Sequence, residues 1–104
     1  MATKLPEDFK KRWIGALRTG DFKQGQGALY DKVSNTYCCL GVAAICEGVP
    51  LDKIMHLGYA HGISEEFRTD GLRALHPLED NFVTLNDSRG KTFSQIADII
   101  EQDY

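Results

Sequence analysis

The chain has 104 residues, of which 42% are hydrophobic and 26% charged, and its formal net charge is −3 at pH 7. These values are typical of one globular domain, residues 1–104, that forms a core without a metal ion or a disulfide. The acidic balance provides no bulk attraction to polyanions, so the composition disfavours a nucleic-acid partner.

The first predicted element is an amphipathic helix that starts at Pro6 and closes at Gly20. Proline is favoured in a first helical turn, and Glu7 and Asp8 stabilise the positive end of the helix dipole. Apolar side chains recur at helical spacing, and we expect Trp13 to dock this helix on the core. The opposite face is basic and carries Lys10, Lys11, Arg12 and Arg18.

A short β-hairpin is predicted next, with strands over 28–31 and about 33–37 around a Ser34-Asn35 turn. The preceding stretch Gln24-Gly25-Gln26-Gly27 lacks the ending and the spacing of a phosphate-binding loop. We therefore expect its glycines to permit positive φ or a close approach of the backbone. Two strands alone are marginally stable, so the hairpin must pack against helices.

The stretch from Cys38 to Cys46 has no charged side chain and is apolar on every face, as in a helix surrounded by protein. It is too short to span a bilayer, which requires about 20 apolar residues. Gly48 and Pro50 provide a helix stop. We predict a buried central helix over about 39–47, within a mainly helical α+β fold.

The second half of the chain gives weaker signals until its end. Residues 51–80 suggest a short helix ending at Gly58, a helical turn at 64–67 and a break before Pro77. The residues from 86 to 90 are turn formers and predict a loop. Thr92 and Gln95 have the spacing of a capping box and begin a final helix. Its predicted buried face consists of Phe93, Ile96, Ala97 and Ile100.

The cysteines allow an enzymatic alternative. Cys38 or Cys39 lies where the chain enters a helix, and a thiolate there gains from the dipole. The side chains that could complete a nucleophilic site are glutamines as oxyanion donors, a histidine as base and an Asn or Asp to orient it: Gln24, Gln26, His56, His61, His76, Asn86 and Asp87. No histidine has a diagnostic spacing, so core thiols are the simpler interpretation.

Neither a metal ion nor a cofactor is predicted. Cys39 and Cys46 share a helical face but are two turns, about 10 Å, apart. That is too far for one ion whose sulfur ligands lie about 2.3 Å away. The odd number of cysteines and the absence of an apolar signal sequence indicate reduced thiols in a cytoplasm, with no membrane association.

Several motifs are spread along the chain: Ala16-Leu17-Arg18-Thr19-Gly20, Gln24-Gly25-Gln26-Gly27-x-Leu29, Tyr37-Cys38-Cys39-Leu40-Gly41-Val42, Leu85-Asn86-Asp87 and Phe93-x-x-Ile96-Ala97-Asp98-x-Ile100-Glu101. As a set they resemble a family of small bacteriophage and prophage proteins without an established activity. The resemblance implies no cofactor and no catalytic residue. It implies a setting, the cytoplasm of a bacterial host, in which small accessory proteins act by binding host proteins.

The leading hypothesis is a non-enzymatic accessory protein that binds a host or defence protein, as a monomer or a homodimer. The predicted contact surface is the basic face of the first helix together with Gln24, Gln26, Asn86 and Asp87. Replacing Asn86 and Asp87 with Ala should then weaken binding while changing stability by less than about 1 kcal/mol, as expected for surface residues. The alternatives are a cysteine-dependent hydrolase or transferase, and a protein that holds a small ligand under the glutamine–glycine loop.

Overall fold

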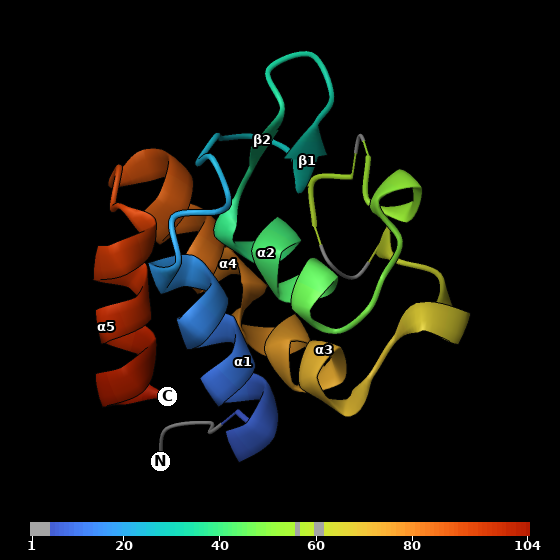
Figure 1. Cartoon of the computed structure of the whole chain (residues 1–104). Coiled ribbons are helices and arrows are strands. Elements are labelled where there is room, and N and C mark those ends of the chain that lie inside the picture. The colour runs from blue at the N-terminus through green and yellow to red at the C-terminus, as the bar shows by residue number, and fades with distance from the viewer. Residues whose placement is uncertain (1–4, 56, 60–61) are drawn as a thin grey trace.

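The computed structural model describes residues 5–55, 57–59 and 62–104 and has a mainly helical α+β fold (Figure 1). Its α-helices are α1 (Glu7–Arg18), α2 (Cys39–Cys46), α3 (Asp70–Leu75), α4 (Glu79–Val83) and α5 (Phe93–Asp103). The strands β1 (Tyr30–Asp31) and β2 (Thr36–Tyr37) form an antiparallel hairpin. Short 3-10 turns cover Leu51–Lys53, Glu65–Phe67 and His76–Leu78, and a π-helical turn covers Thr84–Ser88. The predicted fold class is confirmed.

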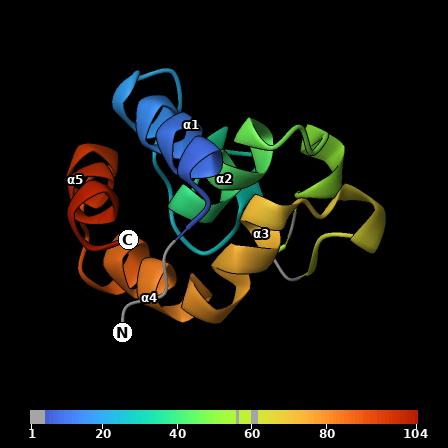
Figure 2. The same ribbon diagram turned by 90° about the horizontal axis from the view of Figure 1, so that it is seen from below.

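Helix α2 is the centre of the fold, with α1, α4 and the hairpin packed around it (Figures 1 and 2). Its residues from Cys39 to Ala44 are all buried, which confirms the predicted central helix. Gly41 makes this packing possible, because a Cβ there would lie 1.9 Å from the carbonyl oxygen of Leu29. Gly48, with φ +84°, ends the helix as predicted.

Helix α1 docks on the start of α2 through Trp13, as the sequence predicts. The buried indole Nε1 donates a hydrogen bond to the carbonyl oxygen of Cys39 at 2.9 Å. The ring stacks on Phe9, with centroids 5.4 Å apart, and meets the edge of Phe82 at 4.9 Å. The indole N–H is therefore satisfied where its ring is buried, which is the usual requirement for core tryptophans.

The hairpin is shorter than predicted and its turn is longer. The loop runs over 32–35 rather than turning at Ser34-Asn35 alone, and Asn35 adopts φ +56°. Side chains account for this difference, because the Asp31 carboxylate accepts from the Val33 amide at 2.9 Å and the Tyr30 hydroxyl donates to Asn35 at 2.8 Å. These bonds stabilise a four-residue loop in place of a tighter turn.

The base of the hairpin is paired on both edges by isolated parallel bridges, Gln24 with Tyr37 and Tyr30 with Met55. On the first of these edges the glutamine–glycine stretch lies close against β2. A Cβ at Gly25 would be 2.2 Å from the Thr36 hydroxyl oxygen, and Gly27 has φ +88°. Both predicted uses of the glycines, close approach and positive φ, therefore occur.

Two predictions for the second half are wrong. The helix expected to end at Gly58 is only a 3-10 turn, because the chain leaves helical geometry to pair Met55 with β1. The loop expected over 86–90 is largely helical, since the π-helical turn continues α4 and the Arg89 amide donates to the Thr84 carbonyl at 2.9 Å. The turn expected at 64–67 is present as a 3-10 helix.

The C-terminal helix matches its prediction. The Thr92 hydroxyl accepts from the Gln95 amide at 3.1 Å, and the Gln95 side chain accepts from the Thr92 amide at 2.9 Å. The expected face of α5 is buried, and the helix packs beside α1. None of the helices in the described part of the chain has the length and apolar character needed to cross a membrane.

Candidate functional site

The four polar residues predicted as a binding set lie together and form what we term the amide clamp: Gln24, Gln26, Asn86 and Asp87. Gln24 Nε2 donates to Asn86 Oδ1 at 2.9 Å and to the Lys91 carbonyl at 2.6 Å. Gln26 Nε2 donates to the carbonyl oxygens of Asn86 and Asp87 at 3.3 and 3.2 Å. The clamp thus joins the loop before β1 to the π-helical turn, some 60 residues later.

Asn86 is the centre of the clamp. Its Nδ2 donates to the Gly25 carbonyl and to Asp87 Oδ1, both at 2.8 Å. The second carboxylate oxygen of Asp87 accepts from the Gly27 amide at 3.2 Å. Asn86 is only 1% exposed, so both of its N–H groups are used inside the protein. Its expected position on a surface is therefore wrong, whereas Gln26 is exposed.

Beside the clamp there is an open pocket of about 450 Å³, lined by Gln24, Gly25, Gln26, Asn86 and Gly90. A small-ligand function would use this pocket. However, the Gln24 amide is already bonded on both sides, since its Oε1 also accepts from the Phe93 amide at 3.1 Å. The clamp therefore primarily connects three segments of the fold.

The two adjacent thiols lack the properties of a nucleophile. Cys38 is 5% exposed and Cys39 is fully buried, with its sulfur donating to the Phe82 carbonyl at 3.6 Å. Burial raises the pKa of Cys38 to about 11 and that of Cys39 well above its usual value. Amides at the start of α2 lower the pKa of Cys38, as the dipole argument expects, but desolvation outweighs them.

Of the three histidines proposed as bases, the structure describes His76. His76 is exposed in the turn after α3, whereas the thiols are buried. His56 and His61 lie outside the described residues. Among the residues that the structure describes, no group of three or more His, Cys, Asp or Glu side chains could hold a metal ion.

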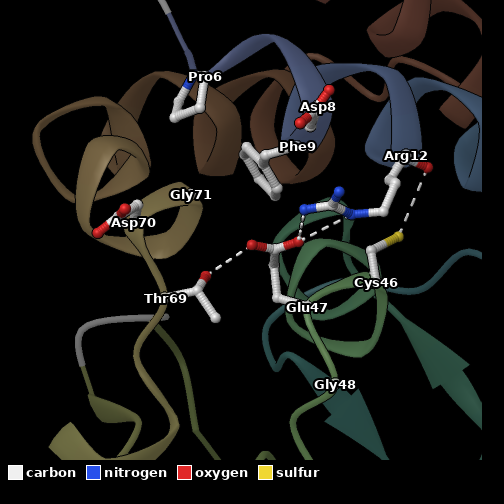
Figure 3. A pocket seen from close by; sticks show the side chains of 10 residues that line it. All are labelled: Pro6, Asp8, Phe9, Arg12, Cys46, Glu47, Gly48, Thr69, Asp70 and Gly71. Atoms are coloured by element: carbon white, nitrogen blue, oxygen red, sulfur yellow. Dashed lines mark hydrogen bonds and ion pairs between the residues drawn. The ribbon is translucent and has the colours of Figure 1, made fainter.

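A larger open cleft, of about 630 Å³, lies between α1, the end of α2 and the start of α3 (Figure 3). The carboxylate of Glu47, 4% exposed, forms its floor. Arg12 donates to one carboxylate oxygen through Nε at 3.1 Å and Nη2 at 2.6 Å. The hydroxyl of Thr69 donates to the other at 2.6 Å. One buried carboxylate thus links three helices.

Arg12 lines this cleft as a partly exposed cation. Its side chain is 51% exposed, and the hydrogen bond to Glu47 raises the pKa of the guanidinium. Gly71 keeps the space open, because a Cβ there would lie 2.6 Å from the Phe9 ring and 2.7 Å from a Glu47 oxygen. Asp8 and Asp70 lie on the walls (Figure 3).

The sequence could not reveal this cleft. Glu47 is 35 residues from Arg12 and 22 from Thr69, and no motif connects them. The available signal was the basic face of α1, which identified Arg12 only as one of four cations. Two of those four are now known to be paired, because Arg18 also forms ion pairs, with Asp98 at 2.7 Å and Glu101 at 3.2 Å.

Together these features define a small α+β protein with open, polar surface hollows. Residues 5–47 are similar to a domain family of unknown function, DUF8296. The match runs from the residue before Pro6 to the end of α2 and covers less than half of the chain. It includes Arg12, Glu47 and the glutamine–glycine loop. No curated protein and no solved structure matches the chain.

Proposed function

We propose that this protein is a small accessory protein of the bacteriophage type, which acts by binding a host or defence protein through the cleft around Arg12. The observation that carries the proposal is a half-exposed guanidinium held in place by a buried carboxylate. The exposed basic face of the first helix already suggested a contact surface. Of the cations on that face, Arg12 is the one that lines the cleft.

A fixed arginine suits protein recognition because little conformational freedom remains to be lost on binding. Both bonds from Arg12 to Glu47 use Nε and Nη2. The N–H groups of Nη1 make no hydrogen bond to residues in the described ranges, so they are free to donate to a partner. Backbone carbonyls of a docked segment are suitable acceptors, and arginine is enriched among residues that dominate interface energies.

The shape of the cleft favours a protein over a small molecule. Sites for small molecules typically enclose most of the ligand surface and are lined mainly by apolar groups. This cleft is open, and its lining includes Asp8, Arg12, Glu47, Thr69 and Asp70. The acidic side chains on its walls also oppose a phosphate backbone.

The alternatives have less support. A cysteine-dependent hydrolase or transferase needs an accessible thiolate, whereas burial raises the pKa of both Cys38 and Cys39. A small-ligand protein would use the pocket beside the amide clamp, where most of the amide groups are already bonded within the chain. The phage setting rests on the resemblance of the sequence motifs.

The test is capture of partners from a bacterial lysate by tagged wild type, Arg12→Lys and Lys11→Gln. Arg12→Lys keeps the charge but loses the fork-shaped donor, and Lys11→Gln removes an exposed charge on the same helix. We expect proteins recovered by wild type and Lys11→Gln to be depleted at least about tenfold with Arg12→Lys. Equal recovery by all three proteins, or no recovery above a tag-only control, would refute the proposal.

A further inference from the structure

The structure has a third hollow besides the cleft around Arg12 and the pocket beside the amide clamp. This groove, of about 380 Å³, follows α4, the π-helical turn and α5. Its apolar lining comes from three half-buried side chains, Leu85, Ile99 and Tyr104. Figures 1 and 2 both place α5 and α3 on opposite sides of α1, and the groove shares no lining residue with the cleft around Arg12.

The two ends of the groove carry opposite charges. Arg89 lies just before α5, and Asp103 is the last residue of that helix. The 11 residues of α5 separate these ends by about 15 Å along the helix axis. The dipole of α5 points in the same direction as this charge separation, because its positive end lies toward Arg89 and its negative end toward Asp103.

Neither end charge forms an ion pair within the described part of the chain. Arg12, Arg18 and Arg73 are paired with acidic side chains, the last of them with Glu65. Arg89, in contrast, is exposed, and it forms no ion pair with any residue in the described ranges. The same holds for Asp103. The groove therefore presents a positive end, an apolar centre and a negative end to solvent.

We propose that this groove binds the groove of a second copy of the chain, antiparallel across a two-fold axis. A two-fold interface requires a surface that complements itself when rotated. Reversal of the groove sets Arg89 of each copy against Asp103 of the other and brings the two apolar centres together. An apolar centre with a charged rim is the usual organisation of a protein interface.

Tyr104 anchors the apolar lining at the Asp103 end of the groove. Its hydroxyl accepts from Asn81 Nδ2 at 3.4 Å, and its ring lies 5.0 Å from the ring of Phe82. Its backbone carbonyl also accepts from the Leu5 amide at 3.3 Å. A tyrosine held in this way adds contact area with little loss of side-chain freedom, which is why tyrosine is enriched where interface energy concentrates.

The test is sedimentation equilibrium of the full chain from about 10 μM to about 1 mM, because a small interface associates weakly. In a dimer of either variant, Arg89→Glu or Asp103→Lys, both contacts between residues 89 and 103 join like charges. Each variant alone should therefore associate at least about tenfold more weakly than wild type. In an equimolar mixture of the two variants every new charge meets its opposite, so association should return. Lys53→Glu changes an exposed charge outside the groove and should behave as wild type.

Three results would overturn the proposal. The first is a wild-type chain that stays monomeric over the whole range. The second is a dimer that both charge reversals leave intact, which would place the interface elsewhere. The third is a mixture that remains monomeric, which would exclude the antiparallel pairing. The capture of host proteins tests Arg12, whereas sedimentation tests Arg89 and Asp103. The outcome of the capture experiment therefore does not decide the outcome of sedimentation.

Discussion

Replacing Asn86 with Ala should lower the free energy of unfolding by about 2–4 kcal/mol, because this buried side chain makes three hydrogen bonds. They connect it to Gln24, to the Gly25 carbonyl and to Asp87. A hydrogen bond contributes about 1 kcal/mol net, and a polar partner left unsatisfied costs about 1–3 kcal/mol. Gln24 retains its bond to the Lys91 carbonyl, which limits the loss. This magnitude replaces the value below about 1 kcal/mol expected for a surface residue.

The assay is urea unfolding followed by the fluorescence of Trp13, which is the only tryptophan and is fully buried. A loss of this size should also lower the melting temperature by about 8–32 °C, because 1 kcal/mol corresponds to about 4–8 °C in a domain of about this length. Gln26→Ala is the matched control within the same clamp. Its side chain is exposed and its bonds are longer, 3.2 and 3.3 Å, so we expect a loss below about 1 kcal/mol.

A free energy of unfolding for Asn86→Ala within about 0.5 kcal/mol of wild type would contradict the structural role of this side chain, as would an equal loss for Gln26→Ala. A double-mutant cycle with Gln24→Ala makes the test stricter. Because the two side chains share a hydrogen bond at 2.9 Å, their effects should be non-additive by at least about 0.5 kcal/mol. Additive losses would mean that the two amides act independently.

Three further predictions follow from local geometry. Gly41→Ala should destabilise the fold by more than about 3 kcal/mol, because the added Cβ would lie 1.9 Å from a backbone oxygen. Gly15→Ala is the matched control, because no atom lies within 4 Å of its added Cβ. In thermal unfolding it should stabilise α1 by about 0.5–1 kcal/mol. Thr92→Ala should cost about 1 kcal/mol in urea unfolding by removing the cap of α5, and a change below about 0.3 kcal/mol would contradict the cap. Burial raises the pKa of Cys46 from 9.0 to about 11, so its alkylation at pH 8 should be about 100-fold slower than that of an ordinary thiol. As pH rises, the Cys46 thiol loses its proton in the unfolded state before it does so in the folded state. The free energy of unfolding should therefore be unaffected by Cys46 below about pH 9 and should fall above it. Equilibrium unfolding of wild type and Cys46→Ala at pH 7 and at pH 10 measures this difference.

The predictable parts of the fold are those that local chemistry determines. The run from Cys38 to Cys46 has no polar face, so a helix formed by it is stable only when protein surrounds it. The capping box from Thr92 to Gln95 depends on residues three apart. Trp13 needed a core to bury its ring. In each case the decisive interactions lie within one helix or follow from the size of one side chain.

The parts that sequence reasoning missed depend on partners far along the chain. Residues 51–55 do not continue as a helix, because Met55 pairs with β1, 25 residues earlier. The turn formers from 86 to 90 are held in a π-helical turn by Gln24 and Gly25, some 60 residues earlier. Intrinsic preferences for turns are weak compared with several specific hydrogen bonds, so tertiary structure overrides them.

The amide clamp explains why its residues looked functional. Side-chain amides next to glycines have unused donors and acceptors in the sequence, and these can be satisfied by a partner or by the chain itself. The distinguishing property is exposure, which no spacing reveals. Here Asn86 is 1% exposed, while Arg12, which no motif marked, is half exposed. The proposed binding therefore rests on a side chain that the fold holds at the surface.

The same long-range contacts imply that the segment matched by the domain family, residues 5–47, does not fold alone. Without the later residues, Trp13 loses the ring of Phe82, α1 loses its neighbour α5, and the Gln24 amide loses every partner in the clamp. A fragment of this length without disulfides or metal buries too little surface to be stable. A peptide of residues 5–47 should thus show no cooperative thermal transition by circular dichroism, and a solvent-exposed tryptophan emission. A cooperative transition with buried emission would mean that α1 and α2 suffice for the core, and that the clamp only fastens the second half to it.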